Sequence, residues 1–178
     1  WGVLIAVESP TQISELDGLL ASLEETRNVP RTVEVVVLLE TEAVLDSIPE
    51  IVGTSSRVSM IVLGNTDLLV EASIGFQAEA SEGDNEALSR KKEHWRSLTT
   101  DILTGGAVPL ALIGATVRSE ELETILATRG GTSVERVLEI ARGVGFHGFV
   151  TAHRQVVETG KYLGTPDKRL IVLNGVSE

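Results

Sequence analysis

Apolar runs of strand length recur along this chain and alternate with segments of helical spacing. A buried parallel strand is a nearly continuous run of Val, Ile and Leu, whereas an amphipathic helix carries its apolar residues three or four positions apart. The runs cover residues 2–7, 33–39, 58–63, 108–113 and 148–152. Helical spacing covers residues 13–23, 43–52, 86–103, 119–127 and 134–143. This alternation predicts an α/β fold with a parallel sheet and right-handed crossovers.

A count of five strands leaves two architectures open. A doubly wound open sheet can be built from five strands, whereas a closed barrel needs eight strands and typically about 250 residues. With 178 residues, of which 42% are hydrophobic, the chain can form one domain with a real core over residues 1–178. Among doubly wound folds we considered a domain resembling a response-regulator receiver. Receivers gather an acidic cluster near the first strand, but here only Glu8 follows residues 2–7.

Composition argues against several classes of partner. The formal net charge of -11 argues against a nucleic-acid-binding surface, which needs clustered cations. The basic cluster Arg90-Lys91-Lys92 reads as a solvated helix face, or as a contact for an anionic cofactor tail. The sequence has no cysteine, which excludes disulfides and thiolate chemistry. No apolar run approaches the ~20 residues of a membrane-spanning helix, so we expect a cytoplasmic protein without a membrane partner.

Two carboxylates follow apolar runs. Glu40 comes directly after residues 33–39, and Asp67 follows residues 58–63 and a short loop. In α/β enzymes ligands bind beyond the carboxyl ends of parallel strands, and carboxylate oxygens suit a hard divalent cation. The pair could therefore form a metal site, although capping the next helix is the commoner role of such residues.

Five short motifs also follow one another along the chain. They are Val7-Glu8-Ser9, Leu38-Leu39-Glu40-Thr41, Leu63-Gly64-Asn65-Thr66-Asp67-Leu68, Ala141-Arg142-Gly143-Val144-Gly145-Phe146-His147-Gly148 and Ala152-His153. In this order they resemble the citrate lyase beta subunit family of the HpcH/HpaI aldolase and citrate lyase superfamily. That family folds as a (β/α)8 barrel, so the resemblance implies an incomplete TIM barrel. The five runs would be its strands four to eight, and the first three strands would lie before Trp1.

The resemblance also implies a site. Glu40 and Asp67 would bind Mg2+ or Mn2+, and backbone N–H groups of Gly64, Asn65 and Thr66 would hold the substrate carboxylate. His153 would contact substrate or CoA, unless it is only a polar residue at a strand end. The implied reaction cleaves a carbon–carbon bond in a 3-hydroxyacyl-CoA of the citryl-CoA or malyl-CoA type, or in a related hydroxy-oxo acid, through a metal-stabilised enolate.

Other features bear on which relative this chain resembles. Leu38 favours the thioester lyases, because the oxo-acid aldolases usually carry Gln at this position. Family members are commonly trimers or hexamers, so a homo-oligomer is expected.

The arginine that the family uses to bind substrate would fall before Trp1, and the family's H-P-x-Q is His153-Arg154-Gln155-Val156 here. No catalytic residue is therefore assigned, and an inactive relative with a role in binding or assembly is the alternative.

Overall fold

The structure is a computed structural model, and it describes residues 2–31, 33–64, 85–112, 134–151 and 169–172. Its strands are β1 (Gly2–Ala6), β2 (Glu34–Leu39), β3 (Val58–Leu63), β4 (Val108–Leu112), β5 (Gly148–Thr151) and β6 (Arg169–Val172). Its helices are α1 (Pro10–Thr26), the 3-10 helix η1 (Glu42–Ser47), α2 (Ile48–Thr54), α4 (Asn85–Thr104) and α6 (Val134–Gly143).

The strands form one sheet whose spatial order follows the sequence. The order is β1-β2-β3-β4-β5-β6, and every neighbouring pair is parallel. A doubly wound sheet reverses its strand order at a switch point, whereas a barrel wall does not. The sequential order therefore matches a segment of a (β/α)8 barrel and excludes the doubly wound alternative for this part of the chain.

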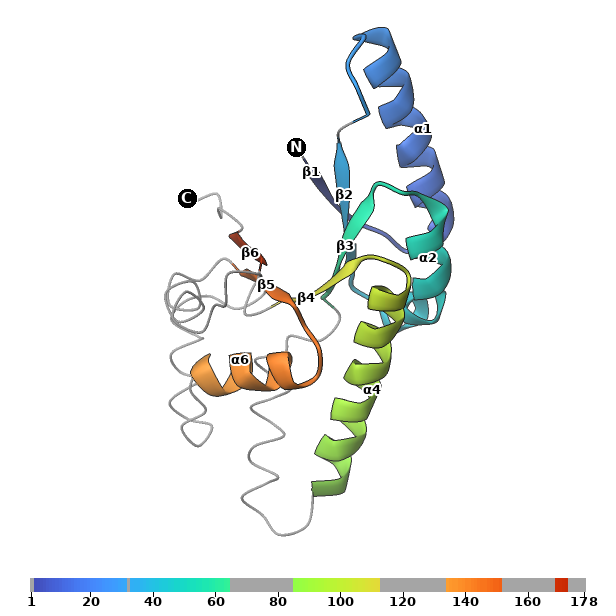
Figure 1. Ribbon diagram of the computed structural model, residues 1–178. Helices are drawn as coiled ribbons and strands as arrows, with labels where there is room; N and C mark the ends of the chain where they lie inside the picture. Colours follow the sequence, from blue (N-terminus) through green and yellow to red (C-terminus); the bar gives the residue numbers. More distant parts are fainter. Residues whose placement is uncertain (1, 32, 65–84, 113–133, 152–168, 173–178) are drawn as a thin grey trace, which may run out of the picture.

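The two faces of the sheet have different surroundings. One buried cluster joins alternate strand residues, such as Val37, Ile61 and Phe149, to apolar side chains of the helices. The second cluster contains strand residues of the opposite face, such as Val62 and Leu110, and no residue of the described helices. Figure 1 shows α1, α2 and α4 along one side of the sheet. Helices on one face and strand side chains alone on the other are the two layers of a barrel wall.

The predicted strands are confirmed to within one residue at each end that the structure describes. The predicted count of five is wrong, because β6 adds a sixth strand that pairs with β5. Its apolar run in the sequence, Leu170-Ile171-Val172-Leu173, has only four residues, too few for a clear strand periodicity. The assignment of the five predicted strands, β1 to β5, as strands four to eight of the family's barrel remains a prediction.

Helix predictions differ in their outcome. The long amphipathic helix at residues 86–103 is α4, which buries Trp95, Leu98 and Ile102. The predicted helix at residues 43–52 is instead η1 followed by α2, because Pro49 cannot donate a backbone hydrogen bond within a continuing helix and here lies in the first turn of α2. The predicted helix at residues 119–127 lies outside the described residues.

A buried arginine joins α1 to the start of β3. The Arg57 side chain is only 2% exposed, and its guanidinium donates to Asp17 Oδ1 (2.6 Å) and to Glu24 Oε1 (2.9 Å). It also donates to the carbonyl of Val33, just before β2. These bonds raise the pKa of Arg57, chiefly through Glu24. The network thus ties one helix to two strands at the amino ends of the sheet.

Replacing Arg57 should strongly destabilise the fold. In Arg57→Met the buried Glu24 carboxylate would lose the guanidinium that balances its charge, and breaking a buried ion pair in this way costs about 3–5 kcal/mol. Urea unfolding followed by circular dichroism would measure this loss. The matched control is Arg31→Met: Arg31 also pairs with Asp17, but its side chain is 53% exposed, so the loss should stay below about 1 kcal/mol. Equal losses in the two variants would contradict the role assigned to Arg57.

Asp17 should make stability depend on pH in acid. Burial alone would raise the pKa of Asp17, but hydrogen bonds from Arg57 and Ser55 and the charge of Arg31 outweigh it and lower that pKa. A lowered folded-state pKa stabilises the protein above the unfolded-state value of about 3.9, and this contribution is lost as pH falls through the folded-state pKa. Between pH 5 and pH 2, Asp17→Asn should therefore lose less unfolding free energy than the wild type. An unchanged slope would contradict this assignment.

The turn after α6 packs tightly on α4. Gly145 has φ +102°, and a Cβ added there would lie 2.7 Å from Thr99 Oγ1. That hydroxyl is itself fixed, because it donates to the carbonyl of Val144 at 2.8 Å from a side chain that is buried. Backbone conformation and packing therefore both require glycine at this turn.

Gly145→Ala should destabilise the protein by about 1–3 kcal/mol, since it combines a strained backbone with overpacking. Gly143→Ala is the matched control, two residues earlier, where an added Cβ meets nothing within 4 Å. That substitution should be neutral or slightly stabilising. Thermal unfolding of both variants would separate the effects, and a neutral Gly145→Ala would show that the turn relaxes.

Candidate site at the carboxyl ends of β2 and β3

Two neighbouring strands end side by side at the carboxyl edge of the sheet. Leu39 and Leu63, the last residues of β2 and β3, are register partners. The next backbone N–H, that of Gly64, donates to the carbonyl of Leu39 at 2.8 Å. Glu40 and Gly64 therefore leave the sheet next to each other, at the edge where α/β barrels bind their ligands.

Strand alternation places both residues on the face without described helices. In β2, Val36 and Leu38 belong to that face, and Glu40 continues the series two residues on. In β3, Met60 and Val62 precede Gly64 in the same way. The face that would line a barrel interior thus ends in a carboxylate on one strand and in a glycine on the next.

The ends of two leucine side chains close over Gly64, so a larger residue there would require these side chains to shift. A Cβ added there would come within 2.6 Å of Leu38 Cδ1 and 3.3 Å of Leu112 Cδ2. Both leucines belong to the same face of the sheet. The missing side chain lets the chain leave β3 between β2 and β4.

Glu40 is exposed, as is Glu8, which follows β1 at the same edge. Within the described ranges neither side chain has a hydrogen bond or an ion pair. An exposed carboxylate at a strand end is suited to a hard cation, and Mg2+ commonly takes one or two protein carboxylates and completes its shell with water or substrate oxygens. Glu40 can therefore contribute one ligand to such a site.

The remaining predicted site residues, Asn65, Thr66, Asp67 and His153, lie outside the described residues. Within the described ones, no group of three or more His, Asp or Glu side chains could hold a metal ion. His94 and His147 are both exposed, as expected for surface residues. The metal site thus remains a prediction for which the structure supplies the position of Glu40 and of the adjoining Gly64.

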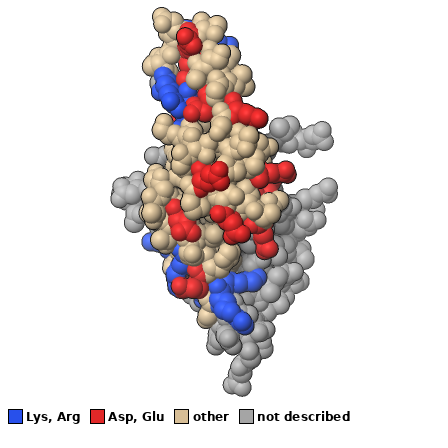
Figure 2. Space-filling model, turned by 90° about the vertical axis from the view of Figure 1, so that its right-hand side faces the viewer, with Lys and Arg blue, Asp and Glu red and all other residues tan. Residues whose placement is uncertain are grey.

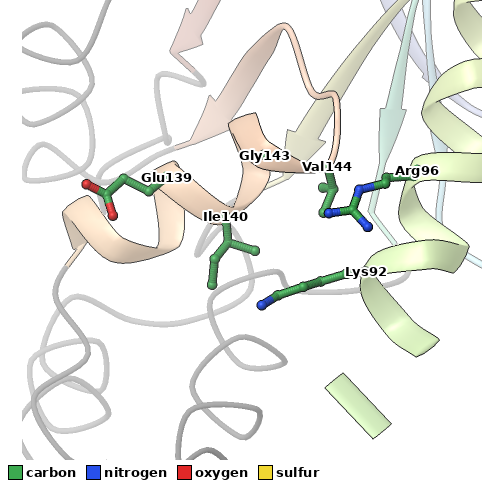
Figure 3. A pocket seen from close by; sticks show the side chains of 6 residues that line it. All are labelled: Lys92, Arg96, Glu139, Ile140, Gly143 and Val144. Carbon is green, nitrogen blue, oxygen red and sulfur yellow. The ribbon is translucent and has the colours of Figure 1, made fainter. Parts of the chain in front are cut away.

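A separate cleft of about 200 Å³ lies between α4 and α6 (Figure 3). Lys92 and Arg96 point from α4 toward α6, where Ile140 and Val144 form an apolar wall, whereas the Glu139 carboxylate points away from α4. Figure 2 shows a group of basic side chains at the lower end of the helix-covered face, below scattered acidic ones. The sequence predicts Lys92 as part of a basic helix face but does not single out Arg96. Arg96 could have been found because it lies four residues further on, one helical turn away on the same face of the helix.

A second hollow, of about 310 Å³, lies at the amino ends of β2 and β3, away from Glu40. Its lining residues are Arg31, Val33, Glu34, Ser56 and Arg57. It borders the buried ion-pair network. In barrels the amino ends of the strands contribute stability, whereas the chemistry takes place at the carboxyl ends. We therefore assign this hollow no ligand.

Among the helices of the described residues, none combines the length and the apolar character that a membrane span requires.

The sheet order and the one-sided helices define a (β/α)8 barrel-type wall with a candidate ligand edge at β2 and β3. Comparison with known families agrees, because the HpcH/HpaI aldolase/citrate lyase model matches residues 3–102, more than half of the chain. The chain therefore belongs to the HpcH/HpaI aldolase/citrate lyase family.

A solved structure shares this fold. RipC from Yersinia pestis matches with a TM-score of 0.55 and 13% sequence identity, over 93% of this chain and 64% of RipC. This chain thus spans less than two thirds of RipC, and at this identity the likeness concerns the fold alone. Among curated proteins, no sequence matches.

Proposed function

We propose that this chain carries the metal-binding wall of a carbon–carbon lyase, with Glu40 and Asp67 as ligands of Mg2+ or Mn2+. The observation that carries the proposal is the position of Glu40. It directly follows β2 at the carboxyl edge, beside the exit of β3, in a chain of an aldolase and lyase family. Asp67 comes three residues after Gly64 in the sequence, within reach of the same edge.

The substrate would be a 3-hydroxyacyl-CoA of the citryl-CoA or malyl-CoA type, or a related hydroxy-oxo acid. The cation would supply positive charge to stabilise the enolate left when the carbon–carbon bond breaks. The Gly64 N–H predicted to hold the substrate carboxylate already donates to the Leu39 carbonyl. Backbone N–H groups of Asn65 and Thr66 would therefore orient the substrate carboxylate beside Gly64, and His153 would contact substrate or CoA. Leu38 lies on the face that would line the barrel. It supports a thioester substrate, because the oxo-acid aldolases usually carry Gln at this position.

Cleavage would require more of the barrel than the strands described here. We infer that the five strands predicted from the sequence, β1 to β5, are strands four to eight of the family's barrel, and that the substrate-binding arginine belongs to an earlier strand of that barrel. The proposal therefore separates metal binding, for which this chain supplies ligands, from cleavage, which depends on the completed site.

A metal titration tests the first part. Loss of the free Mn2+ signal in electron paramagnetic resonance should show one ion bound per chain, and Glu40→Gln or Asp67→Asn should weaken binding at least tenfold, because each removes a charged ligand. Glu25→Gln is the matched control, since Glu25 is exposed near the end of α1, on the side of the amino ends of the strands. Equal binding by all variants would overturn the metal assignment.

Cleavage of malyl-CoA or citryl-CoA by the protein with its complete barrel, followed as formation of glyoxylate or oxaloacetate beside acetyl-CoA with Mg2+ present, tests the second part. Activity that disappears in Glu40→Gln would support the lyase. Metal binding without cleavage would favour the inactive relative and would leave the ligand assignment intact.

A further inference from the structure

The cleft between α4 and α6 has two walls of different chemistry. Lys92 and Arg96 lie four residues apart on α4, hence on one face of that helix, and both side chains point toward α6 (Figure 3). Ile140 and Val144 form the apolar wall on the other side. The cleft volume of about 200 Å³ equals that of roughly six or seven water molecules. A small ligand with one charged end and one apolar end would therefore match both walls.

Hydrogen bonds and packing fix the two walls relative to each other. The hydroxyl of Thr99, a buried residue of α4, donates to the carbonyl of Val144 at 2.8 Å. Gly145 packs directly against the same threonine. On α4 itself, the carbonyl of Arg96 accepts the Thr100 hydroxyl at 2.7 Å. The walls are therefore in place before a ligand arrives, which lowers the cost of ordering them on binding.

The two cations are not required to cap α6. A helix leaves its last carbonyl groups without helical partners, and basic side chains often bind them. Here the turn that follows the helix supplies the donors. Its backbone bonds run from the N–H of Val144 to Ile140, from that of Gly145 to Arg142 and from that of Phe146 to Ala141. Since the carbonyl of Val144 accepts the Thr99 hydroxyl, Lys92 and Arg96 are left to hold an external anion.

The charge around the cleft favours a doubly charged ligand. The chain as a whole carries -11 and repels anions, so an anion bound here depends on the nearest cations. Glu93 pairs with Arg96 at 3.4 Å, but the two side chains are 79% and 52% exposed, and such exposed pairs contribute little. The Glu139 carboxylate points away from α4. Lys92 and Arg96 together match the charge of a phosphate monoester, about -2 at pH 7, better than that of a single carboxylate.

We propose that this cleft binds a phosphate monoester with a small apolar body. Lys92 and Arg96 contact the phosphate, and Ile140 and Val144 contact the hydrocarbon. The cleft lies among the helices that cover one face of the sheet, whereas the proposed metal ligand Glu40 continues the opposite face. It uses none of the proposed metal ligands, so this second ligand site is tested independently of the metal site.

Calorimetric titration of the full chain with phenyl phosphate, in EDTA to exclude divalent metal, tests the choice of ligand. One phenyl phosphate should bind per chain. Inorganic phosphate lacks the apolar body and benzoate has a single charge, so each should bind about tenfold more weakly. No binding of phenyl phosphate at millimolar concentration would overturn the proposal. Equal affinity for inorganic phosphate or for benzoate would overturn the part assigned to the apolar wall or to the paired cations.

Charge-removing variants test the two cations. Lys92→Gln and Arg96→Gln should each weaken phenyl phosphate binding about tenfold, because each removes a charge-assisted hydrogen bond. Lys91→Gln is the matched control: it removes the same charge from an exposed neighbour that is not among the described residues lining the cleft. Circular dichroism should show an unchanged fold in all three. Equal weakening by Lys91→Gln and Lys92→Gln would show diffuse attraction to a basic helix and would overturn the site.

Backbone amide shifts in nuclear magnetic resonance locate the ligand. Phenyl phosphate should shift the amide signals of Arg96, Gly143 and Val144, which line the cleft. The amide of Gly64, at the carboxyl edge of the sheet, should not move. Shifts at Gly64 without shifts at Gly143 and Val144 would place the anion beside the metal site and would overturn the proposal.

Discussion

The parallel pairing of β2 with β3 is the constraint on which the rest of this molecule depends. Because Leu39 and Leu63 are register partners, the two strands end together, and the residues that leave them are neighbours. A register shifted by one residue would turn Glu40 toward the helices and the apolar residues before it toward the opposite face. The same pairing therefore determines the core and the position of the carboxylate.

Stability and function are assigned to opposite edges of this sheet. At the amino ends, Arg57 and its two carboxylate partners tie α1 to β2 and β3 in a buried network. At the carboxyl ends, Glu40 is exposed, and within the described residues its side chain has no hydrogen bond or ion pair, which leaves the carboxylate available for the proposed metal ion. The ion pairs stabilise the strands at their amino ends. The exposed carboxylate at the carboxyl ends therefore needs no structural role.

The sequence predicted the elements whose signal is local. Each long apolar run became a strand, and the spacing of Trp95, Leu98 and Ile102 became the buried side of α4. The motifs around Glu40 and Asp67 led to the family that the comparison shows. Local signals also misled, since Pro49 divided one expected helix into two and the short run of β6 was overlooked.

Other features could not be predicted because they join distant positions. Asp17, Glu24 and Arg57 are unremarkable in the sequence and meet only when α1 packs against the start of β3. The close packing around Gly64 likewise depends on Leu38 and Leu112, which belong to two other strands. Both examples require the strand order to be known first, and periodicity alone left that order open.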